Sequence, residues 1–90
     1  MLKITTQTDE GQTWFELEGR LAGPWVDELA ACWKDSARSR WLGINLKAVT
    51  YIDEGGVKLL KEMHGQGVAI EGSGCMTASI IEAILQEQKS

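Results

Sequence analysis

Residues 44–57 read INLKAVTYIDEGGV, and the change of pattern within them decides the fold. Apolar residues at every second position from 42 to 46 predict a strand with one buried face. After the two glycines the apolar residues recur at helical spacing, so a helix follows. Asp53 lies at the N-cap position, where its carboxylate can accept a hydrogen bond from Gly55 or Gly56. The two glycines are also expected to leave backbone N–H groups uncovered, which suits close approach by a partner or an anion. The stretch therefore predicts a strand, a short loop and a capped helix.

The same two periodicities predict the other elements. They indicate strands at residues 2–6 and 14–21 joined by a turn at 9–11, a helix at about 24–38, the capped helix ending at Gly65, a strand at 68–71 and a last helical stripe over 77–85. Right-handed crossovers would place both connecting helices on one face of the sheet, and each strand is apolar on one side only. The predicted fold class is α/β, a two-layer, four-stranded mixed sheet with helices packed on one face.

One hydrophobic core is expected from these stripes. Its predicted members are Ile4, Phe15, Leu17, Leu29, Trp33, Leu42, Ile44, Leu46, Leu60, Val68, Ile70, Ile81 and Ile84.

Length and charge limit the classes of function. Ninety residues with 43% hydrophobic and 24% charged residues fit a single domain over residues 1–90. A net charge of −4 argues against a nucleic-acid partner, because phosphate binding needs clustered Lys and Arg. No apolar run approaches the ~18 residues of a membrane span, so we expect a cytoplasmic protein without membrane insertion.

Residues that could carry catalysis are sparse. His64 is the sole histidine, and one histidine with two distant cysteines makes a poor zinc site. No phosphate-binding loop is present, and we expect no metal, no cofactor and no enzymatic activity. A distant alternative is a small acid/base enzyme using Asp53, Glu54 and His64. The ends of the predicted helix are about 15 Å apart, too far for shared proton transfer.

Two short segments carry a resemblance to a known family. The residues LEGRL at 17–21 resemble the Gly-Arg/Asp-Leu exit from strand two of the STAS family, and residues 44–56 resemble its strand followed by an Asp-Ser-Ser-Gly loop. The apolar helix after the loop also matches. This fold is shared by anti-sigma factor antagonists and the cytoplasmic tails of sulfate transporters. The resemblance implies a STAS-like fold for the whole chain.

The loop departs from the family pattern where regulation occurs. In the family's regulated antagonists a partner kinase phosphorylates the serine just before the glycine; that position is Gly55 here, and the preceding serine is Glu54. Gly55 has no hydroxyl, so the usual phosphoswitch cannot operate there, although Asp53 and Gly56 keep the framing residues. The chain also looks short for the family after Gln86.

The resemblance implies a non-catalytic STAS-domain regulator that works by protein–protein docking. The partner would be an anti-sigma factor or serine kinase-like switch protein; an accessory subunit docking onto the ATPase of an ABC transporter is the alternative. The implied contact surface is the loop and the helix after it, namely Tyr51, Asp53, Glu54, Gly55, Gly56, Lys58 and Lys61. By alternation Trp14 and Trp41 point away from the core and could form a second surface. The sequence leaves the oligomeric state open.

Overall fold

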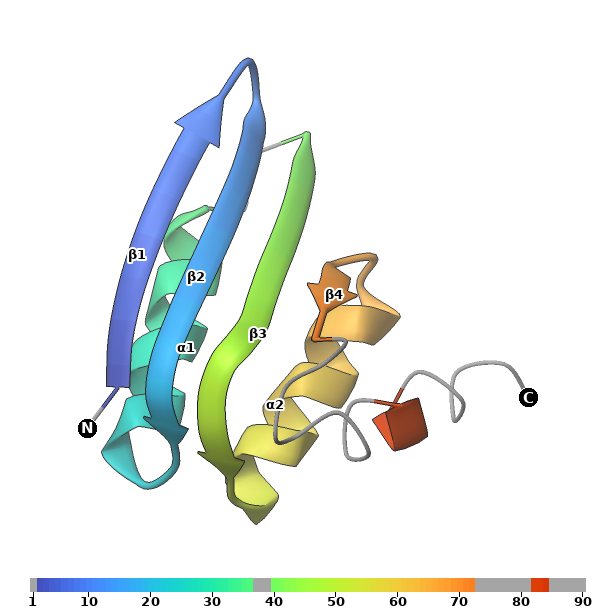
Figure 1. Ribbon diagram of the computed structural model, residues 1–90. Coiled ribbons are helices and arrows are strands. Elements are labelled where there is room, and N and C mark those ends of the chain that lie inside the picture. Colours follow the sequence, from blue (N-terminus) through green and yellow to red (C-terminus); the bar gives the residue numbers. More distant parts are fainter. Residues whose placement is uncertain (1, 37–39, 73–81, 85–90) are drawn as a thin grey trace.

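A four-stranded sheet with helices on one face forms the described part of the protein, which in this computed structural model comprises residues 2–36, 40–72 and 82–84 (Figure 1). The chain runs through β1 (Leu2–Asp9), β2 (Gln12–Leu21), α1 (Pro24–Asp35), β3 (Trp41–Ile52), α2 (Glu54–Gly65) and β4 (Ala69–Glu71). The strand order is β1-β2-β3-β4, and α1 and α2 lie behind the sheet in Figure 1. The predicted fold class is confirmed.

β1 and β2 form the predicted antiparallel hairpin, paired from Leu2 opposite Gly19 to Asp9 opposite Gln12. The two turn residues, Glu10 and Gly11, have φ values of 49° and 84°. Two positive values at these positions are typical of a type I′ turn, whose twist matches that of the strands. β1 continues to Asp9, beyond the predicted end at residue 6. The sequence pattern did not predict this continuation, because residues 5–9 are exposed and carry no apolar alternation.

The two crossovers place β3 parallel to β2 and β4 parallel to β3. α1 has Pro24 in its first turn, where a missing N–H costs no hydrogen bond, and it ends at Asp35 rather than at 38. α2 includes Gly65 and has Gln66 as its C-cap. α2 ends at Gly65, as predicted, and the positive φ that glycine favours occurs two residues later, at Gly67, at +93°.

β3 is one continuous strand with two irregularities against β2. Glu16 lies opposite Asn45 but Glu18 lies opposite Ala48, and the register shifts again between Gly19 and Arg20. Each shift adds one residue to β3, and such bulges bend a strand, as β3 bends midway in Figure 1. The buried positions of β3 therefore change from alternate residues to a spacing of three.

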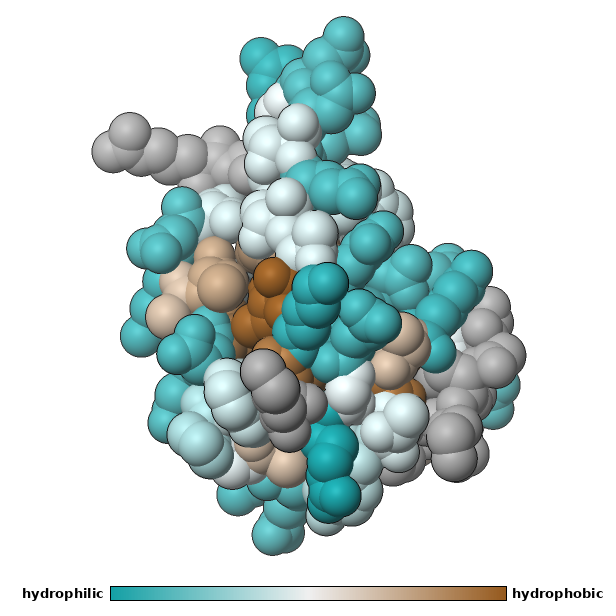
Figure 2. Space-filling view, turned by 60° about the vertical axis from the view of Figure 1, so that its left-hand side comes forward, coloured by the Kyte–Doolittle hydropathy of each residue, from teal (hydrophilic) through white to brown (hydrophobic). Residues whose placement is uncertain are grey.

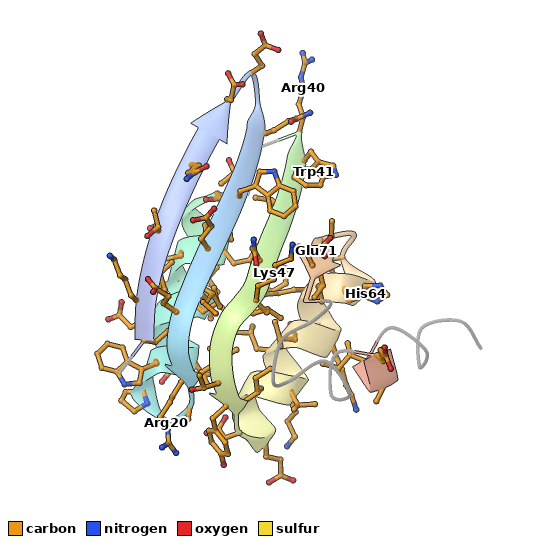
Figure 3. All side chains as sticks on the ribbon, viewed as in Figure 1. Arg20, Arg40, Trp41, Lys47, His64 and Glu71 are labelled. Carbon is orange, nitrogen blue, oxygen red and sulfur yellow. The ribbon has the colours of Figure 1, made fainter. Side chains whose placement is uncertain are left out.

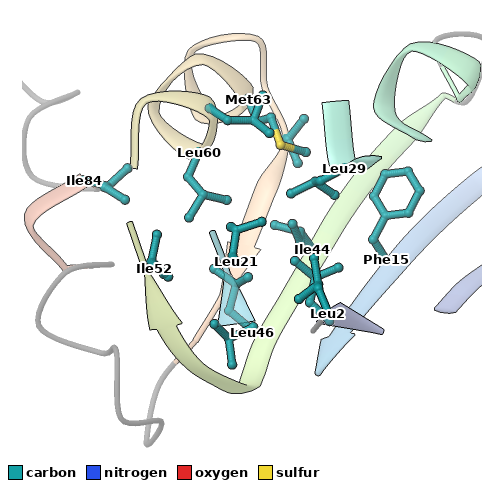
Figure 4. Close-up of a cluster of buried hydrophobic side chains, with 14 residues drawn as sticks. Leu2, Phe15, Leu21, Leu29, Ile44, Leu46, Ile52, Leu60, Met63 and Ile84 are labelled. Atoms are coloured by element: carbon teal, nitrogen blue, oxygen red, sulfur yellow. The ribbon is translucent and has the colours of Figure 1, made fainter. Parts of the chain in front are cut away.

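The core lies between the sheet and the helices (Figure 4). Of the predicted members, eight are buried, and Ile4, Trp33, Leu42 and Ile70 are partly buried against them. Ile81 lies outside the described residues. Buried hydrophobic residues that the prediction omitted are Leu2, Leu21, Val49, Ile52, Leu59 and Met63.

Most of the predicted last helix lies outside the described residues. Residues 82–84 are helical, and Ile84 is only 1% exposed, so this segment contributes to the core (Figure 4). Over residues 2–36, 40–72 and 82–84, no helix has the length and hydropathy to cross a bilayer.

Candidate functional site

Asp53, directly after β3, is hydrogen-bonded to the end of β2, the start of α1 and the start of α2. Its Oδ1 accepts a hydrogen bond from the Gly56 N–H at 2.7 Å, and its Oδ2 accepts one from the Gly23 N–H at 2.9 Å. Its own N–H donates to the Leu21 carbonyl at 3.1 Å. The predicted N-cap is confirmed, and the bond to Gly23 also ties the start of α1 to the start of α2.

The backbone donors around Asp53 stabilise its charged form. The N–H bonds from Gly23 and then Gly56 lower the pKa of the Asp53 carboxyl, and Gly55 adds to the effect. The first turns of two helices also present positive dipole ends to this carboxylate. Asp53 is therefore an ionised structural clamp with both oxygens engaged.

The two glycines at the start of α2 have different surroundings. Gly55 is exposed, and a Cβ there would meet only Asp53 Oδ1 at 3.5 Å and Val26 Cγ2 at 4.0 Å, which are ordinary contacts. Gly56 is buried, and a Cβ there would lie 2.8 Å from Ile52 Cγ2. The expectation of uncovered backbone at both glycines is thus wrong for Gly56, which allows α2 to pack closely on the sheet.

The exposed residues near Asp53 define what we call the loop–helix surface, made of Tyr51, Glu54, Gly55 and Lys58. Tyr51 is 45% exposed, and the Arg20 guanidinium carbon lies 4.7 Å from the centre of its ring. That distance allows a cation–π contact across β2 and β3. Arg20 was not predicted, although it belongs to the outward-facing residues of β2. Lys61 is half-buried and makes interactions of its own.

Trp14 and Trp41 form an aromatic pair. Trp41 lies on the face of the sheet away from the helices (Figure 3). Their ring centres are 4.7 Å apart, with the planes at 65°. Both cover Gly43, where a Cβ would lie 2.5 Å from Trp41 Cη2 and 2.8 Å from Trp14 Cζ3. The outward direction was predicted correctly. Both rings are nevertheless half-buried, because they cover Gly43 and contact each other.

A cleft that the sequence did not reveal lies at the opposite end of the strands. It has a volume of about 530 Å³ and is formed where α1 and α2 end beside the start of β3. Its lining includes Trp33, Lys34, Arg40, Trp41 and Gln66. These residues are far apart in the sequence, so no local pattern brings them together.

The residues of the acid/base alternative do not converge. Asp53 precedes the first turn of α2, whereas His64 lies in its last turn. The His64 Nδ1 is buried and has no hydrogen-bond partner in the described part of the chain. Among the same residues, no three His, Cys, Asp or Glu side chains are grouped to hold a metal ion.

Comparison with known proteins identifies the fold. No family model matches the sequence, and no curated protein matches it. Among solved structures, an anti-sigma factor antagonist from Mycobacterium paratuberculosis is similar, with 18% identity, a TM-score of 0.75, and 98% of this chain and 81% of that chain covered. The STAS domain of an anti-sigma factor antagonist from Rhodobacter sphaeroides has 16% identity and a TM-score of 0.64, over 79% of this chain and 86% of that chain.

Two further solved structures are similar. The anti-sigma factor antagonist SpoIIAA in its unphosphorylated form is 14% identical, with a TM-score of 0.64 over 98% of this chain and 100% of that chain. A structure described as Mglu has 20% identity and a TM-score of 0.62 over 77% of this chain, but the match spans only 19% of that chain. The protein therefore has the fold of STAS domains and anti-sigma factor antagonists.

Proposed function

We propose that this chain is a non-catalytic regulatory protein that docks onto a protein partner through the loop–helix surface. One observation carries the proposal: Gly55 is exposed and its immediate surroundings are only ordinary contacts, at the start of a helix that Asp53 fixes in place. A partner can approach such a position without meeting a side chain. The fold shared with anti-sigma factor antagonists supports an anti-sigma factor or a serine kinase-like switch protein as the partner.

Fixing the surface before binding favours affinity. The two bonds of Asp53 hold the loop against both helices, and the Arg20 contact restrains Tyr51 on the neighbouring strand. Less conformational freedom then has to be lost when a partner binds. Lys58 adds an exposed positive charge one turn beyond Gly55, which suits an acidic rim on the partner.

Docking at this surface would not be switched by phosphorylation of residue 55, the position of the family's phosphoserine. Gly55 provides no hydroxyl to phosphorylate. The adjacent Glu54 carries one negative charge, less than a phosphate, and lies one residue earlier. Stoichiometric phosphate on Thr50 or Tyr51 in protein from the native cell would instead indicate a relocated switch.

The acid/base alternative fits the geometry poorly. A general base needs a free oxygen and a pKa near the working pH. Both Asp53 oxygens accept backbone N–H bonds, and these bonds lower the pKa of the carboxyl. This arrangement supports the non-catalytic proposal.

The experiment is to isolate the partner and map its contact surface. Affinity capture from the native cell with mass spectrometry would name the partner, and calorimetry would measure its affinity for purified variants. Gly55→Trp and Lys58→Glu should each weaken binding at least ~tenfold, or about 1.4 kcal/mol. Ala31→Trp and Lys34→Glu, at exposed positions of α1, are the matched controls and should bind normally.

The same measurements can contradict the proposal. If Gly55→Trp and Lys58→Glu bind as the wild type while Trp14→Ala or Trp41→Ala abolishes binding, the contact surface is the aromatic pair instead. Capture of a transporter ATPase in place of a kinase-like or anti-sigma protein would support the accessory-subunit alternative. Circular dichroism and thermal melting must show that each variant is folded.

A further inference from the structure

β1 is an edge strand with no described element beside its outer side. It stands first in the strand order and pairs only with β2 in the ranges that the structure describes (Figure 1). Residues 5–9 are exposed on both faces of the strand. α1 contacts β2 and α2 more extensively than it contacts β1. Such an edge presents a row of unpaired backbone groups to solvent.

The turn determines which residues of β1 direct their backbone groups outward. In a type I′ hairpin the residue before the turn bonds to the residue after it, so Asp9 and Gln12 form a hydrogen-bonded pair. Along an antiparallel pair, hydrogen-bonded and non-bonded positions alternate. The odd-numbered residues of β1 therefore bond to β2, and Ile4, Thr6 and Thr8 direct their N–H and C=O groups outward.

β1 lacks several of the features that usually protect an edge, although it carries charged residues at Lys3 and Asp9. It contains no proline, no glycine and no bulge, and Ile4, Thr5, Thr6 and Thr8 are β-branched residues that favour strands. Figure 2, turned to bring this side forward, shows an apolar patch near the centre of the view, below the hydrophilic hairpin tip. Ile4 is one of the core residues that stay only partly buried. A strand added beside β1 would cover it further.

The sequence of β1 is self-complementary about Thr6. If two copies of β1 pair antiparallel with Thr6 opposite Thr6, Lys3 of each copy lies opposite Asp9 of the other, and Ile4 lies opposite Thr8. Lys3 and Asp9 are both odd-numbered, so they share the open face and occupy non-bonded positions, where side chains are closest. Both are exposed and available for this contact.

We propose that the outer edge of β1 binds a second copy of this chain, forming a two-fold dimer with one continuous eight-stranded sheet. Thr6 pairs with Thr6, and Ile4 pairs with Thr8 on either side of it, with two Lys3–Asp9 ion pairs flanking them. A register centred on Thr5 would place Lys3 opposite Gln7 and leave Asp9 without a charged partner, so charge selects the register centred on Thr6.

The dimer leaves the loop–helix surface free. Tyr51 lies on β3, and the other residues of the loop–helix surface lie at the start of α2, which follows β3. In the sheet, β2 separates β3 from β1. The inference is independent of the proposed function, because it concerns another part of the molecule and needs no other partner.

Sedimentation equilibrium of the full chain at rising concentration tests the association. We expect a reversible monomer–dimer equilibrium. Thr6→Pro removes an outward N–H, a change that an edge strand tolerates, and it should weaken the dimer at least ~tenfold. Thermal melting checks that this variant stays folded. A wild type that is monomeric up to about 1 mM, the weak end of ordinary affinities, would overturn the proposal. So would a dimer indifferent to Thr6→Pro.

A charge exchange tests the register. Lys3→Glu and Asp9→Lys should each weaken the dimer, and the double variant should restore it. Lys47→Glu, exposed on β3 and away from β1, makes the same change in net charge as Lys3→Glu and should leave the dimer intact. Failure of the double variant to restore association, or an equal effect of Lys47→Glu, would show that the Lys3–Asp9 pairing is wrong. Binding of a different protein at β1 by a monomeric chain would likewise refute the second copy as occupant.

Discussion

Alanine at each of the two neighbouring glycines in the first turn of α2 should have opposite effects on stability. A Cβ at Gly56 would lie 2.8 Å from Ile52 Cγ2 and 2.9 Å from the Leu21 carbonyl oxygen, well inside the ~3.5 Å at which carbon contacts become favourable. The Leu21 oxygen is backbone and accepts the Asp53 N–H, so it cannot simply rotate away. Relief of the overlap requires a shift of α2 from the sheet.

The magnitude follows from two contributions. Overpacking of this kind costs about 1–3 kcal/mol, while alanine gains about 0.5–1 kcal/mol over glycine inside a helix. Gly55→Ala meets only ordinary contacts and should gain the second contribution alone. The helix contribution is similar at both positions, so the difference between the two variants isolates the overpacking cost of about 1–3 kcal/mol.

Urea unfolding of the wild type and both variants measures this difference. The midpoint should move down for Gly56→Ala and stay or rise for Gly55→Ala, with unchanged slopes. In a domain of this size a difference of about 1 kcal/mol also separates the melting temperatures by roughly 4–8 °C. A Gly56→Ala variant as stable as Gly55→Ala would refute the close approach of α2 to Leu21 and Ile52.

Two further perturbations examine the core and the clamp. Ile44 is fully buried in the middle of the sheet, so Ile44→Ala should lower the free energy of unfolding by about 2–5 kcal/mol in denaturant titrations; an unchanged midpoint would contradict its position. The folded-state pKa of Asp53 is lowered, so its contribution to stability is present above the unfolded pKa and is lost as pH falls through the folded pKa. Wild type should therefore melt above Asp53→Asn at neutral pH, and the gap should close at a pH below about 4; a gap independent of pH would show that the carboxylate charge is not involved.

The sequence predicted those parts of the fold that depend on local patterns. The hairpin, both crossover helices and the Asp53 cap come from alternation, helical spacing and capping chemistry within a few residues. Val49 and Ile52 were absent from the predicted core because two bulges interrupt the period of two in β3. A bulge is set by pairing with another strand, which a reading of β3 alone cannot detect.

The sequence did not predict the contacts around the candidate site that span long stretches of chain. The sequence predicted uncovered backbone at Gly56 from the glycines of the loop alone. In the structure Leu21, which is distant in the sequence, packs against Gly56. The bond from Gly23 to Asp53 likewise joins residues 30 positions apart. The exposed positions of Tyr51 and Lys58 agree with the local pattern, since alternation and helical spacing assign both to outer faces.

The two bulges of β3 also determine where the chain can change in length. Lys47 and Thr50 are the extra, exposed residues between paired positions, and loss of either would bring the following residues into regular register without turning Val49 or Ile52 towards solvent. Loss of a residue from the regularly paired part of the strand would reverse the inner and outer faces of the residues beside it. Single-residue insertions and deletions among proteins of this fold should therefore gather at these two positions of β3, and chains without them should have a straighter strand at the same place.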